Sequence, residues 1–136
     1  MKAESVWAAA MEIDTGRVIA WGQSNSFNPN TLENIKEYSN LGTQMPYEPG
    51  STMKSFTWAA AMNEGKYDGE IKAEGNKWCY TSDRKNNPVR TGESKSYGCI
   101  YNARRHQWGS QSLDSGLVYA LNTIAATILT EHITPN

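Results

Sequence analysis

Residues 48–56 read Glu-Pro-Gly-Ser-Thr-Met-Lys-Ser-Phe and give the strongest indication of the architecture. Pro49 and Gly50 interrupt the preceding chain, and residues 51–64 are rich in helix formers and end before a glycine, which predicts a helix over 51–64. The start of this helix carries an S-x-x-K pattern, Ser51 and Lys54. Positions three apart share one helical face, so the lysine amine can reach the serine hydroxyl.

The predicted helix is apolar nearly all round, with Phe56, Ala59, Ala60 and Asn63 on successive turns, so we expect it to be buried. Burial disfavours the charged lysine, and a neutral lysine can take the proton of a serine hydroxyl and activate it as a nucleophile. The helix N-terminus adds partial positive charge where an oxyanion would form. The alternative is an ordinary N-cap serine followed by a surface lysine.

The rest of the chain predicts a mixed α+β fold. Residues 5–21 read as a β-hairpin, because two apolar runs flank the turn Asp14-Thr15-Gly16. Residues 22–50 read as a long irregular segment. Residues 66–109 are polar and predict irregular chain with short strands, and residues 112–132 return to a helical pattern that Ser112 or Ser110 can cap.

Composition excludes several classes of protein. The 136 residues carry 13 Lys and Arg against 14 Asp and Glu, with a pI near 6.1, which argues against a nucleic-acid binder. No apolar run approaches the roughly 18 residues of a spanning helix, and we find no signal peptide. Two cysteines and two histidines form no zinc pattern, so we expect no metal and no cofactor. Cys79 and Cys99 are two buried thiols or one disulfide in an oxidising compartment.

A second S-x-x-K pattern shows that the motif alone is weak evidence. Ser82-Asp83-Arg84-Lys85 runs into Asn86-Asn87-Pro88, where no helix would hold the serine beside the lysine. We interpret it as a solvated turn.

The segment from Tyr47 to Phe56 closely resembles the active-site helix of class B penicillin-binding proteins, the D,D-transpeptidases of bacterial cell-wall synthesis. The resemblance continues in the hairpin at residues 12–20, in Phe27-Asn28-Pro29-Asn30, and in Trp108-Gly109 followed by Leu113 through Leu117. It implies a partial penicillin-recognising serine transpeptidase fold, with the N-terminal β-hairpin and the active-site helices present and the remaining strands of the sheet missing. Ser51 would be the nucleophile and Lys54 its base.

The second motif of that family, S-x-N, departs from the pattern here. The aligned residues are Ala120-Leu121-Asn122, so the resemblance implies a substrate-binding role for Asn122 while a methyl group replaces the proton-shuttling hydroxyl. The alternative is that Asn122 ends a helix and faces solvent. Ser26-Phe27-Asn28 also spells S-x-N, but it precedes Ser51 and the family order rejects it.

The third motif, K-T-G, does not follow Asn122. Arg90-Thr91-Gly92 resembles it but precedes Asn122, and we interpret it as a turn. Residues 1–136 are therefore expected to be the N-terminal part of a transpeptidase domain, inactive in isolation. An incomplete sheet would leave an open edge that could pair with a second copy of the chain.

The resemblance implies a peptidoglycan D,D-transpeptidase that cross-links stem peptides ending in D-Ala-D-Ala through a serine acyl-enzyme and is acylated by β-lactam antibiotics. Its other partners would be the cell-division or elongation machinery. It would work at the extracytoplasmic face of the bacterial cell membrane, with its anchor outside these residues. Some class B enzymes carry a Cys pair between the first two motifs, where Cys79 and Cys99 lie, so a disulfide is possible. The alternatives are a non-catalytic homologue with a scaffolding role and a serine β-lactamase.

Overall fold

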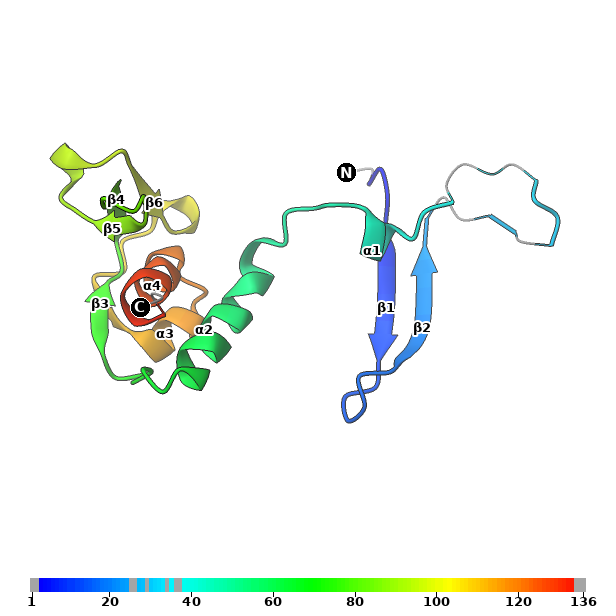
Figure 1. Cartoon of the computed structure of the whole chain (residues 1–136), viewed down its shortest axis with the longest axis horizontal. Coiled ribbons are helices and arrows are strands. Elements are labelled where there is room, and N and C mark those ends of the chain that lie inside the picture. The colour runs from blue at the N-terminus through cyan, green and yellow to red at the C-terminus, as the bar shows by residue number, and fades with distance from the viewer. Residues whose placement is uncertain (1–2, 25–26, 29, 34, 36–37, 134–136) are drawn as a thin grey trace. The chain divides into compact units, whose positions relative to one another are not determined.

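The structure, a computed structural model, describes residues 3–24, 27–28, 30–33, 35 and 38–133. It contains helices and antiparallel strands, which confirms the α+β class. The chain forms two compact units, Met1–Glu48 and Pro49–Asn136, within which most contacts between residues are made (Figure 1). Among the described residues, no helix has the length and apolarity needed to cross a membrane.

The first unit contains the hairpin expected at residues 5–21. Strand β1 (Trp7–Met11) pairs antiparallel with β2 (Val18–Gln23), which runs two residues further than expected. Gly16 adopts a φ of 71° in the turn, a conformation that glycine reaches without steric cost. Trp7 and Trp21 stack with ring centroids 5.3 Å apart. A short helix, α1 (Leu41–Gln44), completes the unit.

The open edge expected of this sheet is present in the described part of the chain. The sheet has only the two strands β1 and β2, and each pairs only with the other. A strand with unpaired N–H and C=O groups can accept another strand, so pairing between copies of the chain stays a prediction. Pro29 and Ser26, which belong to two of the quoted segments, lie outside the described residues.

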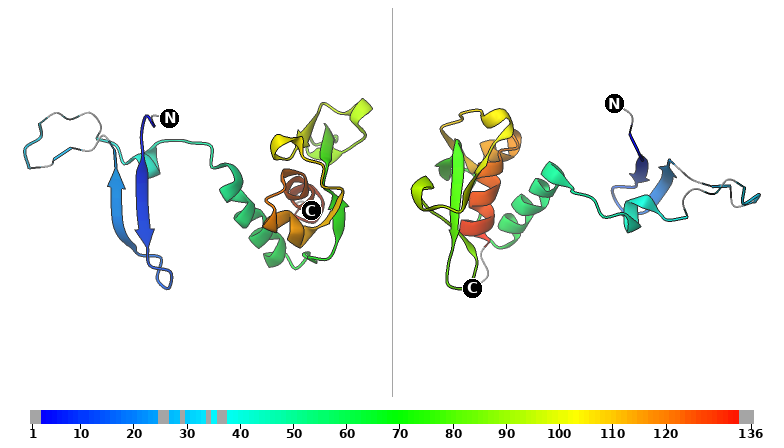
Figure 2. Two further views of the ribbon diagram at one scale, coloured as in Figure 1. Left: turned by 180° about the vertical axis from the view of Figure 1, so that it is seen from behind. Right: turned by 90° about the horizontal axis from the view of Figure 1, so that it is seen from above.

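The helices of the second unit pack around one apolar core, and their ribbons lie close together in both views of Figure 2. A 3-10 turn, η1 (Gly50–Thr52), leads into α2 (Met53–Asn63), where the helix was expected. The core joins α2 to α3 (Leu113–Val118), α4 (Asn122–Thr127) and the π-helical turn η4 (Ile128–His132). Its fully buried members are Trp58, Ala61, Leu113, Leu121, Ile124 and Ile128.

The expected burial of α2 on all sides is wrong. Phe56 is 67% exposed, and the buried side chains of this helix are Lys54, Trp58 and Ala61. These three are spaced four and three residues apart, so they form one face, while the predicted face lies on the opposite side of the helix. Trp58 determines which face of α2 is buried, because its indole N–H donates to the Leu113 carbonyl at 3.1 Å inside the core.

Short strands occupy residues 66–109, together with the 3-10 turns η2 (Glu93–Lys95) and η3 (Ala103–Arg105). Strand β3 (Lys72–Glu74) pairs with β7 (Ser110–Ser112). In a separate sheet, β4 (Lys77–Ser82) lies between β5 (Pro88–Arg90) and β6 (Gly98–Tyr101). Cys79 and Cys99 face each other across β4 and β6 and are joined by a disulfide. The disulfide thereby links β4 to β6, two strands that are distant in the sequence, and both strands contact α4.

The helical pattern at 112–132 forms two helices instead of one. Ser112 caps α3 by accepting a hydrogen bond from the Ser115 N–H at 3.1 Å, as expected. Ala120 then adopts a φ of 51°, and the N–H groups of Ala120 and Leu121 donate to the carbonyls of Leu117 and Gly116. This is a Schellman ending, which normally places glycine at the left-handed position. Because alanine stands at this position, no glycine marks the end of α3 in the sequence.

Replacing Ala120 by glycine is expected to stabilise the chain. Glycine removes the steric cost of a left-handed backbone, and part of that gain is lost to the greater entropy of the unfolded chain, so the free energy of unfolding should rise by about 0.5–1 kcal/mol. The measurement is urea unfolding of the full chain. The matched control is Ala59→Gly on the exposed side of α2, which should lower stability by about 1 kcal/mol. A destabilised Ala120→Gly variant would show that the left-handed turn is wrong.

Candidate active site

The S-x-x-K residues lie at the junction of η1 and α2. Ser51 is exposed, while Lys54 is only 9% exposed, and their Oγ and Nζ atoms are 3.2 Å apart. One helical turn separates them, so the backbone itself brings the two groups together. The alternative of a capping serine with a surface lysine is wrong, because neither η1 nor α2 has a side-chain cap and Lys54 is buried.

Lys54 has three oxygen partners. Besides Ser51 Oγ, its Nζ contacts the Ala120 backbone carbonyl and, at 2.7 Å, Asn122 Oδ1. The carbonyl and the amide oxygen can only accept hydrogen bonds, so they need two N–H groups of the lysine. A neutral amine has two N–H groups and one lone pair. In this neutral form the lone pair can face the Ser51 hydroxyl, the arrangement that removal of its proton requires, whereas in the charged form all three N–H groups donate.

Burial lowers the pKa of Lys54 below the ordinary lysine value. Desolvation is the cause, because the charged ammonium loses more hydration than the neutral amine. A lysine with a lowered pKa spends more time in the form that can accept a proton at neutral pH. The side chain therefore combines the position and the protonation behaviour of a general base.

Asn122 is the first residue of α4, and both ends of its side-chain amide are used. Oδ1 accepts from Lys54, and Nδ2 donates to the Tyr101 carbonyl at 2.9 Å. The orientation of the amide is unambiguous, because a carbonyl accepts only and must face the NH2 end. The alternative, a helix-end asparagine facing solvent, is therefore wrong.

Position 120 contributes its backbone to the site. The left-handed turn at Ala120 directs its carbonyl to the Lys54 amine, so this residue helps to hold the lysine. Its side chain is a methyl group, which neither donates nor accepts a proton. The site thus keeps the positioning of the lysine and lacks a hydroxyl at position 120.

Sequence reasoning missed Tyr101 and the pair Asn102–Thr123. Tyr101 acts through its backbone carbonyl, and any residue type supplies a carbonyl, so no sequence signal could have identified it. Asn102 and Thr123 are buried and hydrogen-bonded to each other beside Asn122. A buried asparagine is a signal in principle, but its burial was not visible in the polar stretch 66–109.

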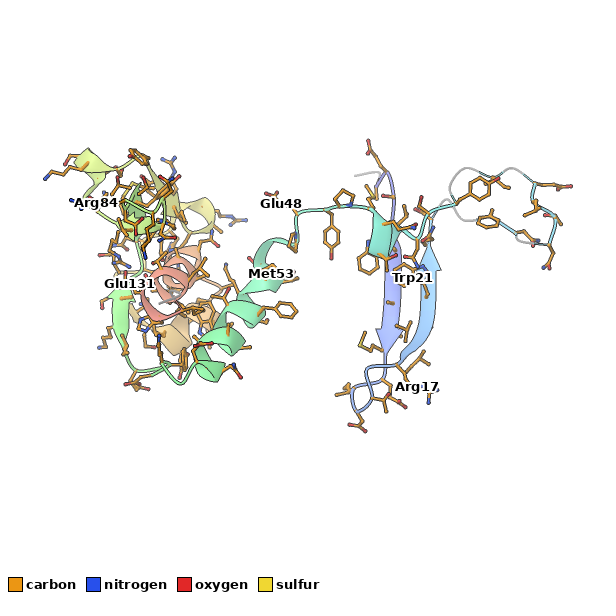
Figure 3. All side chains as sticks on the ribbon, viewed as in Figure 1. Arg17, Trp21, Glu48, Met53, Arg84 and Glu131 are labelled. Carbon is orange, nitrogen blue, oxygen red and sulfur yellow. A yellow bond between two sulfur atoms is a disulfide. The ribbon has the colours of Figure 1, made fainter. Side chains whose placement is uncertain are left out.

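The second S-x-x-K pattern at Ser82–Lys85 and the K-T-G-like segment at Arg90–Gly92 do not contribute to this site. Ser82 ends β4 and Lys85 lies in the following turn, where Asp83 Oδ1 accepts from the N–H groups of Lys85 and Asn87 at 2.8 Å each (Figure 3, beside Arg84). This confirms a turn without a helix. Arg90 is the last residue of β5 rather than part of a turn, and its guanidinium pairs with Glu131 at 3.0 Å.

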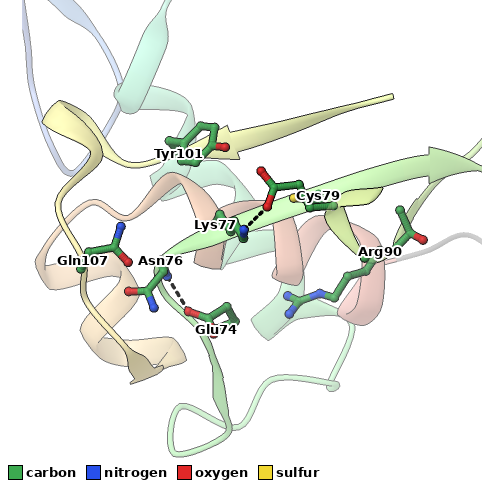
Figure 4. A pocket seen from close by; sticks show the side chains of 10 residues that line it. Glu74, Asn76, Lys77, Cys79, Arg90, Tyr101 and Gln107 are labelled. Atoms are coloured by element: carbon green, nitrogen blue, oxygen red, sulfur yellow. Dashed lines mark hydrogen bonds and ion pairs between the residues drawn. The ribbon is translucent and has the colours of Figure 1, made fainter. Parts of the chain in front are cut away.

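A separate cavity of about 400 Å³, whose lining residues are mostly of polar or charged type, lies over the disulfide-linked strands (Figure 4). Its lining includes Cys79, Lys77 and Arg90, and none of its lining residues is Ser51, Lys54 or Asn122. Lys77 is paired with Glu93. Within the described residues, no group of three His, Cys, Asp or Glu side chains could hold a metal ion.

The lysine pKa values give a direct test of this geometry. Lys54 is expected to titrate below the ordinary value of 10.5 because it is desolvated, while Lys77 should titrate above it because it donates a hydrogen bond to Glu93. NMR titration of the chain labelled with 13C-lysine measures both through the chemical shifts of the Cε carbons, with no change to the amines. Lys77 is the internal control. A Lys54 pKa at or above 10.5 would contradict its buried position.

Comparison with known proteins shows the family of this chain. The profile of the penicillin-binding protein transpeptidase domain matches residues 6–119. Two relatives are the peptidoglycan D,D-transpeptidase FtsI of Escherichia coli strain K12 and that of Escherichia coli O157:H7, each 36% identical over 66 residues. The match covers 47% of this chain and 11% of each relative. Because the family profile matches most of the chain, the protein belongs to the penicillin-binding protein transpeptidase domain family.

Proposed function

We propose that these residues serve a peptidoglycan D,D-transpeptidase in which Ser51 is the nucleophile, Lys54 the general base and Asn122 a substrate-binding residue. The observation that carries the proposal is the buried Lys54 amine, held by Asn122 and the Ala120 carbonyl within 3.2 Å of Ser51 Oγ. Two E. coli relatives named as peptidoglycan D,D-transpeptidases support the choice of substrate.

The reaction begins with proton transfer from Ser51 to Lys54. The serine oxygen bonds to the carbonyl carbon between the two D-Ala residues of a stem peptide, and the C–N bond breaks to release the terminal D-Ala, which takes up a proton. An amine of a neighbouring stem peptide then attacks the acyl-enzyme and restores the Ser51 hydroxyl. Lys54 can accept and return these protons because burial keeps its pKa low.

β-Lactam antibiotics would acylate the same serine, since their strained amide presents the same kind of carbonyl. The cell-division or elongation machinery would be the protein partner. The Cys79–Cys99 disulfide supports work at the extracytoplasmic face of the bacterial membrane, because disulfides persist in oxidising compartments.

Ser51→Ala should abolish covalent labelling by a fluorescent penicillin in the full-length gene product, because no other group in the site can form the acyl-enzyme. The adduct is located by mass spectrometry of the digested protein. Ser82→Ala, which removes the serine of the look-alike motif, is the matched control and should label normally. Labelling that persists in Ser51→Ala would refute the assignment of the nucleophile.

A second candidate function is a non-catalytic homologue with a scaffolding or binding role. Ala120 is the observation that favours it, because the site lacks a hydroxyl that could pass a proton to the leaving group. A serine β-lactamase is less consistent with the matched transpeptidase profile.

Ala120→Ser separates the two functions. If the protein is an enzyme that has lost one proton carrier, acylation of Ser51 by penicillin should become about 10²-fold faster, in line with the usual contribution of a positioned proton donor. The second-order acylation rate constant of the full-length protein measures this. Ala126→Ser, elsewhere in α4, should leave the rate unchanged. A slow rate that Ala120→Ser does not alter favours the scaffold.

A further inference from the structure

Two buried polar side chains flank the contact between Asn122 and Tyr101. Asn102 directly follows Tyr101 at the end of β6, and Thr123 directly follows Asn122 in α4. Asn102 is 6% exposed and Thr123 is completely buried. Thr123 is therefore next in sequence to Asn122, which accepts from the Lys54 amine, and Asn102 is next to Tyr101, whose carbonyl accepts from Asn122.

Asn102 connects three backbone segments. Its Oδ1 accepts from the Thr123 N–H at 3.3 Å, and its Nδ2 donates to the Gly75 carbonyl. The Thr123 hydroxyl lies 3.3 Å from Nδ2 and 3.4 Å from Oδ1. Both ends of the amide are thus satisfied inside the protein, as a buried polar group requires.

The start of α4 depends on this contact. The first N–H groups of a helix have no partner within the helix and are usually satisfied by a capping side chain. Leu121 holds the N-cap position of α4 and its apolar side chain makes no capping bond. Asn102, from a different element of the fold, satisfies the Thr123 N–H instead.

We propose that Asn102 is a positioning residue for acylation of Ser51: it fixes the first turn of α4 against the end of β6, and so keeps the Asn122 amide between the Tyr101 carbonyl and the Lys54 amine. The proposal rests on the proposed function. The geometry leaves little freedom, because Asn122 must satisfy a 2.9 Å contact on one side and a 2.7 Å contact on the other. A small rotation of the first turn of α4 would break one of them.

Acylation of Ser51 by penicillin in the full-length gene product tests the proposal. Asn102→Ala should slow the acylation step about 10- to 100-fold and leave the affinity of the initial non-covalent complex nearly unchanged, because a displacement near 1 Å can cost about 10²-fold in rate. Asn102→Asp keeps an acceptor oxygen for Thr123, but as a carboxylate it turns its second oxygen to the Gly75 carbonyl, so it should also slow acylation. Wild-type rates in a folded Asn102→Ala would overturn the proposal.

A matched control separates positioning from stability. Ile128→Val lies in the same core, at the start of η4 directly after α4, and removes one methylene from a completely buried side chain. It should lower the melting temperature without slowing acylation at temperatures where the protein is folded. If Asn102→Ala does not fold, Thr123→Val removes only the hydroxyl of the pair and should slow acylation by a smaller factor. An unchanged rate in Thr123→Val would then overturn the proposal.

Amide hydrogen exchange tests the same contact without any acylation. In the full chain, the Thr123 N–H should exchange faster in Asn102→Ala, relative to neighbouring α4 amides, and should keep its relative protection in Ile128→Val. If the wild type were not acylated on Ser51, the proposed function would fail while this exchange measurement would still decide whether Asn102 holds the helix. Equal relative protection in all variants would overturn the positioning role.

Discussion

The burial of one amine governs the chemistry of this protein. Lys54 lies on the same face of α2 as Trp58 and Ala61. The packing of Trp58 in the core therefore also shields the Lys54 side chain from solvent. A buried ammonium needs several hydrogen-bond partners, and a buried neutral amine needs fewer. Ser51, Asn122 and the Ala120 carbonyl supply these partners. The packing of this face of α2 in the core therefore also causes the lowered pKa of Lys54.

Two hydrogen-bond partners of Lys54, the Ala120 carbonyl and Asn122, lie at the turn between α3 and α4. Core packing requires the same turn. Gly116 in α3 approaches Ile124 in α4 so closely that a Cβ on Gly116 would lie 2.3 Å from an Ile124 methyl carbon. A single straight helix over 112–132 would keep these residues eight positions apart along one axis, too far for contact. The left-handed turn at Ala120 folds α4 back against α3. The same turn aims the Ala120 carbonyl and Asn122 at Lys54.

The sequence predicted the parts of the site that local spacing determines. The S-x-x-K pair and the helix that follows Gly50 depend on neighbours within a few helical turns, and the hairpin depends on two strands that one short turn connects. The face of α2 that is buried depends on Trp58 meeting Leu113, 55 residues away, and helical periodicity in an alanine-rich segment does not distinguish it. The break at Ala120 carries no glycine. The roles of Tyr101 and Asn102 arise from long-range contacts to α4, which no local pattern encodes.

Alanine at position 120 separates two tasks that one residue could perform together. Holding the lysine is a task of the backbone carbonyl, and the left-handed turn provides it whatever the side chain is. Passing a proton to the leaving group is a task of a hydroxyl, and a methyl group cannot perform it. Ser51 and Lys54 therefore remain in place, and under the proposed function the deficit would fall on the departure of the leaving group. An enzyme with this site would be slowed in the chemical step, because a proton donor to the leaving group acts only when the bond to that group breaks.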